Sequence, residues 1–516
     1  MEIDLNNLPQ DIGQCHAIIE QSQAMIAELV QELDVKEKRL RRIQHQLEKL
    51  LRWKYGPKRE KIDENQMFLF AIHMVGADQD VEVRQEKPPG KKPRRSSHGR
   101  KRLPKDLDRQ RQVHDLPEGE RRCPQCRDEL RYIGEDTSEQ LEYEPARWYV
   151  IKHVRRKYAC PKGCTVVTAE KPMQPIEKGM AGPGLLAHVA VSKYADHQPL
   201  HRQETMFARE GINLSRKTLC GWMRQCADVM VPLFEEMKKR AVSSKTMQTD
   251  DTPVGVLDPA LTRTRKGRIW TYVGDEEHPY TVYDYTPTRK REGPEEFMKD
   301  FEGYLQADAY SGYDALYKDA QRNVTEVACW AHARRKFYEA QTSDLMRSMV
   351  ILAYVRLLYE VEREAKDRSL DGPGRLALRR EKSVPILADM EKYLIHEKTN
   401  VLPKSPIGDA ITYALGNWPA LVRYCEDGDL EIDNNGAERS LRGIAVGRKN
   451  WMFFGSDRGG RTAAILTSFM TTCKRHGINP CEYMRDVLAR ISAHPAKRIE
   501  ELLPDQWKAA RAAAPP

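Results

Sequence analysis

Three acidic residues stand at positions from which their carboxylates could hold metal ions for phosphodiester chemistry. Asp250, or its neighbour Asp251, lies in a strand-like segment, Asp308 ends another, and Glu438 falls near the start of a helical segment. Mg²⁺ prefers oxygen ligands and keeps several waters, so three carboxylates and substrate phosphates suffice to bind it. Two such ions roughly 4 Å apart activate an attacking oxygen and stabilise a leaving oxygen. We therefore expect two Mg²⁺ (or Mn²⁺) ions held by Asp250, Asp308 and Glu438.

Taken singly, each acid also has an ordinary structural explanation. Asp308 could be a turn residue at a strand end, and Glu438 could pair with Arg442 four residues later on one helix face. Asp250 and Asp251 could form a simple polar strand end. The catalytic interpretation therefore depends on the elements that would bring the acids together.

Those elements follow one another in the order of a ribonuclease-H-like fold. The sequence predicts strands at 245–257, 267–274, 279–286, 303–310 and 324–330, with helices at 294–301 and from 331. The first acid of such a fold lies on the first strand and the second at the end of the fourth, which are the places of Asp250 and Asp308. A later helix supplies the third acid, with Asn434 or Asn435 as its cap and Glu438 in its first turn. Residues 337–425 between the last two acids are helix-rich, so we expect a helical insertion there.

Four cysteines in two short knuckles predict a structural zinc site. Cys123 and Cys126 have a C-x2-C spacing, Cys160 and Cys164 a C-x3-C spacing, and strand-like alternation fills the 33 residues between the pairs. Four thiolates suit tetrahedral Zn²⁺ and leave no open position for catalysis. Disulfides are the alternative, but the N-terminus has no secretory signal, so we expect reduced thiols.

A heptad pattern predicts a coiled coil in the first 60 residues. Ile19, Ile26, Leu33, Leu40 and Leu47 recur every seven residues, and the segment between Ala17 and Tyr55 contains no proline or glycine. A narrow apolar seam of this kind suits a partner helix, so we expect a homodimer or higher oligomer. The alternative is one amphipathic helix that docks on its own domain.

The net charge of +9 is concentrated in one arm. Residues 86–105 carry nine Lys or Arg and one acid, interrupted by Pro, Gly and Ser, so they form no regular element. The arm is either a solvated linker or a segment that binds DNA phosphates. Its candidate DNA-binding residues are Lys91, Lys92, Arg94, Arg95, Arg100, Lys101 and Arg102.

Further candidate DNA contacts lie in three later segments. Residues 183–224 read as two helices joined by a glycine turn at 211–213, with Ser215 capping a second helix that presents Arg216 and Lys217. Any two packed helices with a short turn give this pattern. The segment is therefore either a DNA-recognition motif or an ordinary pair of packed helices. The other candidates, which could equally be core or surface residues, are His332, Arg334 and Arg335 after Cys329, and Arg439, Arg442, Arg448, Lys449 and Trp451 after Glu438.

Several long motifs resemble the transposases of the bacterial insertion sequence 66 family. They are TDDTPVGVL, LQADAYSGYDALY, CWAHARRKFYEA and IDNNGAERSLRGIAVGRKNWMFFGSDRGGRTAAILTSF, in the family's order. The resemblance implies a DDE transposase with Asp250, Asp308 and Glu438 as its acids. It also implies small accessory proteins from the same element. The family has Asp-Glu-Thr-Pro at the first site, where this chain has Asp250-Asp251, so both aspartates remain candidates.

We therefore expect a multidomain α+β enzyme that cuts and joins DNA at the terminal inverted repeats of a mobile element and at target DNA. No segment approaches the about 18 apolar residues of a membrane span. The resemblance implies a location on DNA in the bacterial cytoplasm. The alternatives are a non-catalytic zinc-containing DNA-binding regulator and a ribonuclease-H-like nuclease without strand transfer. The expected domains are a coiled-coil helix (1–60), a basic linker arm (61–109), a zinc-binding domain (110–175), a helical DNA-binding segment (176–240), a catalytic domain (241–475) and a C-terminal segment (476–516).

Overall fold

The structure of the chain is a computed structural model. It describes residues 173–513 apart from 178, 262 and 320, together with the backbone of two short strands and five single residues before 173. The single residues are Gln23 and Ile26, which are helical and exposed, and Trp148, Val150 and Ile151. The rest of the expected coiled coil, the basic arm and the four cysteines of the expected zinc site lie outside the described residues.

The chain divides into two compact units. One comprises residues 1–79 and 172–516, and the other residues 80–171. In the second unit, β1 (Lys157–Ala159) pairs antiparallel with β2 (Val166–Thr168). In sequence, these strands flank the segment that contains Cys160 and Cys164.

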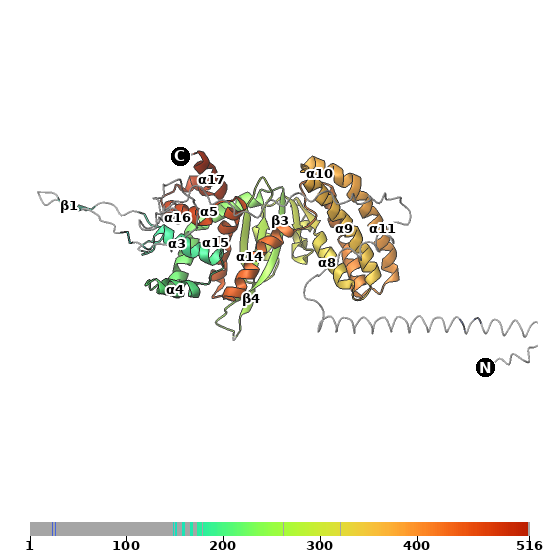
Figure 1. Ribbon diagram of the computed structural model, residues 1–516, viewed down its shortest axis with the longest axis horizontal. Helices are drawn as coiled ribbons and strands as arrows, with labels where there is room; N and C mark the ends of the chain where they lie inside the picture. Colours follow the sequence, from blue (N-terminus) through green and yellow to red (C-terminus); the bar gives the residue numbers. More distant parts are fainter. Residues whose placement is uncertain are drawn as a thin grey trace, which may run out of the picture. The chain divides into compact units, whose positions relative to one another are not determined.

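A mixed sheet forms the centre of the larger unit, in the strand order β5-β4-β3-β6-β7, with β8 pairing with β3 (Figure 1). Its strands are β3 (Thr246–Val256), β4 (Arg265–Val273), β5 (Thr281–Thr286), β6 (Gly303–Ala307), β7 (Val324–Ala328) and β8 (Phe453–Phe454). The first three strands are antiparallel, whereas β6, β7 and β8 run parallel to β3 or to each other. The strands and the short helix expected from the sequence are therefore present in the predicted order.

Two helices cover the α14 side of the sheet. Helix α14 (Asn435–Trp451) runs along β3, and α15 (Asp457–Arg475) packs on β5. Val254, Val256 and Phe454 form a buried cluster with Leu441 and Ile444 of α14. The opposite side carries α6 (Glu292–Phe297), the 3-10 turn η2 (Ser311–Tyr313) and α7 (Asp314–Lys318).

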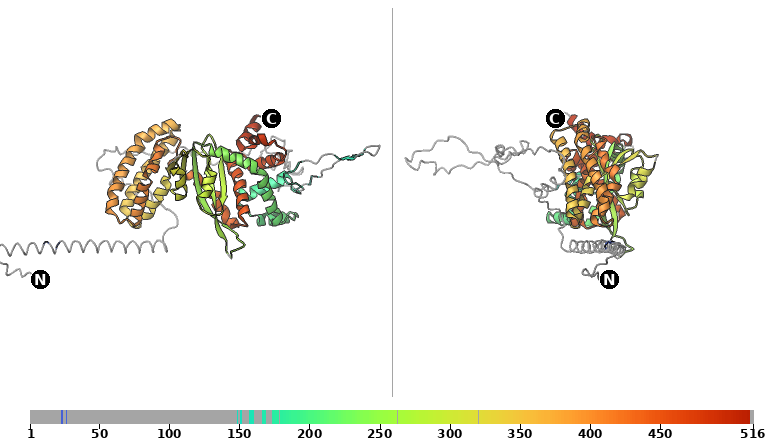
Figure 2. Two further views of the ribbon diagram at one scale, coloured as in Figure 1. Left: turned by 180° about the vertical axis from the view of Figure 1, so that it is seen from behind. Right: turned by 90° about the vertical axis from the view of Figure 1, so that its right-hand side faces the viewer.

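The helices before the sheet pack with those at the C-terminus (Figure 2). They are α3 (Pro183–Tyr194), α4 (Leu200–Arg209), α5 (Arg216–Val242), α16 (Pro480–Arg490), the 3-10 helix η5 (Ala496–Leu502) and α17 (Pro504–Ala513). Between α4 and α5, Gly211 has a φ of +79°, and the Ser215 side chain accepts a hydrogen bond from the Thr218 amide. The helix, glycine turn and Ser215 cap predicted from the sequence are all found.

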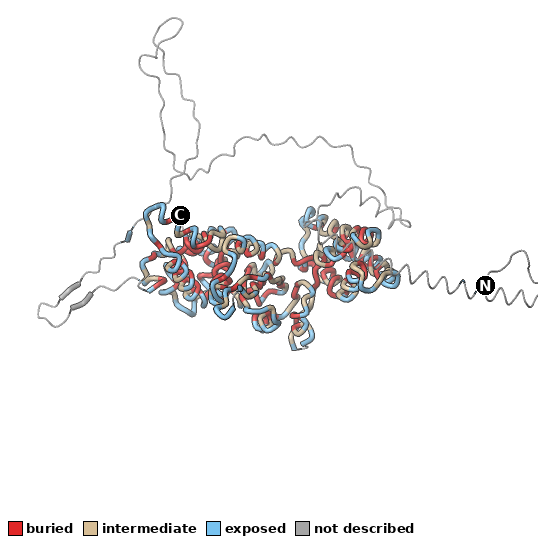
Figure 3. Tube along the Cα trace, turned by 90° about the horizontal axis from the view of Figure 1, so that it is seen from below, coloured by how far each residue is buried: buried red, intermediate tan, exposed pale blue. Residues whose placement is uncertain are grey.

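The segment after β7 is a helical bundle, as predicted. It comprises α8 (Trp330–Ala340), α9 (Leu345–Asp367), α10 (Gly372–Leu378), the π-helical turn η3 (Arg379–Ser383), α11 (Val384–Asn400), α12 (Pro406–Gly416), α13 (Trp418–Val422) and the 3-10 turn η4 (Arg423–Cys425). Its apolar core is centred on Trp330, Ile351, Leu394 and Ile411, all of which are inaccessible to solvent. Buried residues therefore run through both the sheet region and the bundle (Figure 3). None of the helices in the described part of the chain has the length and apolar character of a membrane span.

Candidate active site

Asp250 and Asp251 lie in β3 at the point where the buried side of the strand changes. Before them Met247 and Thr249 are buried, and after them Thr252 and Val254 are buried. Because successive side chains of a strand point to opposite faces, Asp250 faces α14 and Asp251 faces the other side of the sheet.

Asp251 is held by two arginines. Its side chain is 3% exposed, and the Arg268 guanidinium donates to Oδ2 over 2.7 Å. The Nε of Arg289 donates to Oδ1 over 3.0 Å, and its Nη2 lies 2.9 Å from the same oxygen. Arg289 in turn packs over the Tyr310 ring at 4.0 Å from its centroid. The Asp251 carboxylate is therefore committed to ion pairs within the fold.

Asp250 has a different environment, in which other carboxylates are its neighbours. Its Oδ1 accepts a hydrogen bond from the Asp251 amide at 2.7 Å. Burial raises the pKa of Asp250 to about 7, and the negative charges of Asp308, Asp251 and Glu438 act in the same direction. Loss of solvent and crowding of like charges are what a bound cation would relieve.

Asp308 reaches the same region from the end of β6. Gln248 and Gln306 are partners in the parallel register of β3 and β6, so the residues two positions later, Asp250 and Asp308, are level on the two strands. Burial raises the pKa of Asp308, the charges of Asp251 and Glu438 raise it further, and His332 and Arg289 oppose this effect. Arg289 Nη2 lies 3.6 Å from Asp308 Oδ2.

Glu438 is brought to the site because the start of α14 is tied to β3. Gln248 Oε1 accepts a hydrogen bond from the Ala437 amide at 3.2 Å. A side chain at Gly436 would place its Cβ 2.4 Å from that same oxygen, so it would displace the Gln248 amide from this position. Glu438 lies in the first turn of α14, and its buried Oε1 has no hydrogen-bond partner among the residues that the structure describes.

The capping of α14 differs from the prediction. Asn434 occupies the N-cap position, but its side chain does not cap the helix and instead donates to the Thr249 carbonyl at 3.3 Å. Asp433 Oδ1 accepts from the Asn435 amide at 3.0 Å and so provides the capping interaction. Asn434 is drawn away because its buried amide finds a backbone acceptor on β3.

Cys329 and His332 connect α8 to the start of α14. The Cys329 thiol is buried and accepts a hydrogen bond from the Asn434 amide at 3.4 Å. His332 Nε2 lies 3.6 Å from Glu438 Oε1. Burial lowers the pKa of His332, whereas Glu438 and Asp308 raise it. Cys329 therefore contacts the residue before α14, and the His332 imidazole lies next to the Glu438 carboxylate.

The acidic side chains fit a divalent cation in chemistry and charge. Asp250, Asp308 and Glu438 supply hard oxygen ligands, and no residue in the described part of the chain donates a hydrogen bond to the buried Glu438 Oε1. Among the residues that the structure describes, no three His, Cys, Asp or Glu side chains are close enough as they lie to hold one ion.

The candidate DNA contacts after Glu438 lie in different environments. Arg448 donates to Thr252 Oγ1 at 2.9 Å and to the Pro253 carbonyl at 2.7 Å, so it fixes α14 to β3. Trp451 is half-buried and stacks on Phe454 at a centroid distance of 4.5 Å. The candidates with exposed side chains are Arg216, Lys217, Arg335, Arg439, Arg442 and Lys449, whereas Arg334 is half-buried.

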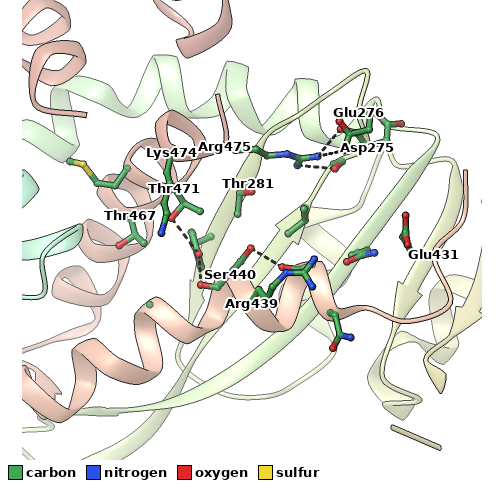
Figure 4. A pocket seen from close by; sticks show the side chains of 18 of the residues that line it. Asp275, Glu276, Thr281, Glu431, Arg439, Ser440, Thr467, Thr471, Lys474 and Arg475 are labelled. Carbon is green, nitrogen blue, oxygen red and sulfur yellow. Dashed lines mark hydrogen bonds and ion pairs between the residues drawn. The ribbon is translucent and has the colours of Figure 1, made fainter. Parts of the chain in front are cut away.

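A large cavity lies beside α14. The cavity has a volume of about 1820 Å³ and is lined by residues of α14, α15 and β5 (Figure 4), and also of β3 and α9. Arg439 and Ser440 line it from α14, opposite Thr467 and Lys474 of α15. The three acids do not line it, so Arg439 lies on a different flank of α14 from Glu438.

Four residues of the site were missed by the sequence reasoning. Gln248 and Arg268 belong to the same strand pair as the aspartates, and Arg289 and Asp433 lie in the connections that follow β5 and precede α14. The two-residue alternation of β3 and β6 could have indicated Gln248, because it lies two positions before Asp250 on the same face. Arg289 carries no comparable local signal.

Comparisons with known proteins give consistent matches along the chain. Four family models match: "Transposase IS66 family" at residues 178–462, "zinc-finger binding domain of transposase IS66" at 120–163, "IS66 C-terminal element" at 468–504, and "Transposase C of IS166 homeodomain" at 42–111. The zinc-finger match contains Cys123, Cys126 and Cys160 and ends one residue before Cys164.

Three proteins of Sinorhizobium fredii (strain NBRC 101917 / NGR234) are similar over most of their length. Uncharacterized protein y4hP is 35% identical over 435 residues, which are 80% of this chain and 78% of that protein. Uncharacterized protein y4qI is 33% identical over 90% of this chain and 88% of its own length. Uncharacterized protein y4jD is 33% identical over 79% and 82%, respectively.

Proposed function

The chain belongs to the IS66 family of transposases, and on this premise we propose that it cuts and joins DNA strands with Asp250, Asp308 and Glu438 as its metal-binding catalytic acids. The observation that carries the proposal is the convergence of these three half-buried carboxylates, from β3, the end of β6 and the first turn of α14, on one region. Burial raises the pKa values of Asp250 and Asp308, and the negative charges of neighbouring carboxylates, Glu438 among them, raise both further.

The arrangement of the sheet supports a ribonuclease-H-like catalytic domain. Three antiparallel strands are followed by two parallel ones, and β3, which carries the first acid, lies in the middle. The second acid follows the adjacent parallel strand, and the third lies on a helix that crosses β3. The proposed domain spans 241–475 and includes the helical insertion at about 337–425.

The proposed chemistry has two related steps. In cleavage, a water oxygen bonds to the phosphorus, the P–O3′ bond breaks, and the 3′ oxygen leaves with a proton. In joining, that 3′-hydroxyl attacks a target phosphodiester and displaces another 3′ oxygen. Two divalent cations at the site would supply activation of the attacking oxygen and neutralisation of the leaving oxygen. The carboxylates of Asp250, Asp308 and Glu438 would hold the ions, and no covalent protein intermediate is formed.

The remaining domains would bind and pair the DNA ends. Cys123, Cys126, Cys160 and Cys164 would hold one structural zinc ion in the zinc-binding domain. The basic arm and the α4–α5 helices would bind the terminal inverted repeats, and the coiled coil would join two protomers. Small accessory proteins of the same element would complete the assembly.

A strand-transfer assay with the full chain tests the proposal. We expect Mg²⁺-dependent cleavage and joining of DNA that carries the element's inverted repeats, and a loss of at least about 100-fold in Asp308→Asn, by analogy with removal of other key charge-stabilising groups. Asp314→Asn is the matched control, since Asp314 is an exposed α7 carboxylate paired with Lys318. Full activity in Asp308→Asn would overturn the assignment of that acid.

The products of the same assay separate the alternative functions. Joined strands indicate a transposase, whereas cut strands without joining indicate a nuclease. DNA binding that needs no metal, with neither product, would indicate a non-catalytic regulator.

A further inference from the structure

The outer end of the β3–β4 ribbon has one buried face and one exposed face. Val254 and Val256 pack with Phe454 in the core beneath α14. On the other face of β3, Pro253 is exposed and Leu257 is 45% exposed. This second face contains apolar side chains that no element of the described structure covers.

Gly255 lies at the centre of the exposed face. It is the register partner of Lys266 in β4 on one side and of Phe453 in β8 on the other. Partners in a register point to the same face, so Lys266 and Phe453 flank Gly255 at about 10 Å from each other, two strand spacings apart. We call Pro253, Gly255, Leu257, Lys266 and Phe453 the ribbon-tip surface.

Glycine keeps the space between Lys266 and Phe453 open. A Cβ at position 255 would lie 3.3 Å from the Phe453 Cβ and 3.6 Å from Thr264 Oγ1. Phe453 itself is 39% exposed, in contrast to its neighbour Phe454, which is buried. The preceding residue, Met452, is 68% exposed and has a φ of +61°.

The charge of this surface is positive. Lys266 is exposed and has no ion-pair partner within the described part of the chain. The neighbouring acids are both paired, Asp251 with Arg268 and Arg289, and Asp258 with Arg265. An anionic ligand with a flat apolar component therefore complements the ribbon-tip surface.

We propose that the ribbon-tip surface binds a DNA strand by stacking an unpaired base on Phe453 and contacting its phosphate with Lys266. An exposed ring offers little to the sugar–phosphate backbone, and the face of a base is available to it only when the base has left the duplex stack. The inference rests on the proposed function, because it concerns the same DNA substrate.

The ribbon-tip surface lies on the face of the sheet opposite the Asp250 carboxylate. Gly255 is five residues along β3 from Asp250, which corresponds to about 17 Å. The surface would therefore hold a part of the DNA strand away from the phosphate that the acids bind.

Binding of a single-stranded probe tests this inference. The probe is a 20-nucleotide thymidine strand with one 2-aminopurine, with its duplex form for comparison, in EDTA so that no cleavage occurs. Affinity is measured by fluorescence anisotropy for the full chain, and stacking by 2-aminopurine fluorescence. The variants are Phe453→Ala, Phe453→Trp and Lys266→Gln. The control is Leu345→Ala, which removes an apolar side chain 50% exposed at the start of α9.

We expect Phe453→Ala to weaken single-strand binding by roughly 5- to 100-fold and Phe453→Trp to restore it, as for loss of one base–aromatic stack. Lys266→Gln should reduce the slope of log affinity against log salt by about 0.7, the value for one phosphate of a single strand. Leu345→Ala should bind as the wild type does, and the Phe453 variants should bind the duplex as the wild type does.

Three results would overturn the inference: no single-strand binding by the wild type, wild-type affinity in a Phe453→Ala protein of unchanged melting temperature, or equal losses for Phe453→Ala and Leu345→Ala. Failure of the proposed catalysis is distinguishable from these results. If the wild-type chain binds the probe through Phe453 but cleaves no DNA in Mg²⁺, the ribbon-tip inference is supported and the catalytic assignment is contradicted.

Discussion

Asp250 and Asp251 are adjacent in β3, yet their carboxylates lie on opposite faces of the sheet. Asp251 is neutralised by Arg268 and Arg289, whereas Asp250 is surrounded by further negative charge. The two aspartates could not be separated by sequence, but their environments differ in kind. Asp250 lies among other carboxylates, and Asp251 forms a structural ion pair.

This difference predicts opposite effects of two conservative substitutions. Asp250→Asn should abolish strand cleavage but leave the metal-free protein at least as stable, because it removes a buried carboxylate that is repelled by its neighbours. Asp251→Asn should lower the free energy of unfolding by roughly 2–4 kcal/mol, since two guanidinium groups lose their partner. Urea unfolding and the cleavage assay measure the two effects. If Asp251→Asn is stable and inactive while Asp250→Asn is active, then Asp251 is the catalytic acid and Asp250 is not.

Local pattern was sufficient to place the acids on their elements. Alternation of apolar residues and turn sequences predicts β3 to β7, and the acids follow from their positions within those segments. The contacts that complete the site are between residues far apart in the chain, such as Gln248 with Ala437 and Arg289 with Asp251. A single sequence has no local signal for such pairs.

The solvent exposure of the aromatic side chains after α14 could not be predicted from the sequence either. Trp451 and Phe453 are two residues apart, and both are aromatic residues next to basic ones. Only the pairing of β8 with β3 shows that Phe453 is presented to solvent while Trp451 stacks on Phe454. The same limit applies to Arg448, whose guanidinium turns inward to β3.

The helical insertion depends on one buried arginine. Arg379 is fully buried, and its guanidinium makes a bidentate ion pair with Glu362, in which Nε donates to Oε1 over 2.8 Å and Nη2 donates to Oε2 over 2.7 Å. It also donates to the carbonyls of Tyr424 and Asp427 at 2.8 and 3.0 Å. Arg379→Ala should therefore cost about 3–5 kcal/mol of unfolding free energy, because the Glu362 charge is left unpaired. Calorimetry against Arg380→Ala, an exposed neighbour in η3, measures this cost, and equal melting temperatures would contradict it.

A half-buried carboxylate on β5, that of Asp284, predicts a pH-dependent stability. Burial raises the pKa of Asp284 to about 6 from its ordinary value of 3.8, against the opposing charges of Lys238 and Arg461. The folded state therefore binds the proton more tightly than the unfolded state. The stabilisation from this proton is complete below about pH 4 and is lost as the pH rises through 6.

Replacement of Asp284 by asparagine removes this titration. At pH 8, Asp284→Asn should be more stable than the wild type by up to about 3 kcal/mol, and at pH 4 most of the difference should vanish. Urea unfolding at the two pH values measures it, with the exposed Asp300→Asn as the control. A gain that is the same at both pH values would show that Asp284 is not the titrating group.

Metal content tests the zinc-binding domain. The wild-type chain should contain about one zinc per molecule, because four thiolates close one tetrahedral site. Cys123→Ser should lose that zinc and the protease resistance of residues 110–175, since metal binding and folding of such small domains are coupled. Cys220→Ser, which removes an exposed free thiol on α5, should keep both properties. Retained zinc in Cys123→Ser would mean that this cysteine is not a ligand.

The basic arm predicts a steep dependence of DNA binding on salt. Residues 86–105 carry nine of the chain's 85 Lys and Arg residues against one acid, and each phosphate that they neutralise releases counterions. If about four of these cations contact duplex phosphates, replacing the arm by a Gly/Ser segment of equal length should reduce the slope of log affinity against log salt by about 3.6. The length is kept so that the flanking domains stay connected by the same span. Titrations of one duplex between low and physiological salt measure the slope for both proteins. An unchanged slope would show that the arm is a linker, and would assign the phosphate contacts to exposed cations of the folded domains such as Arg216 and Lys449.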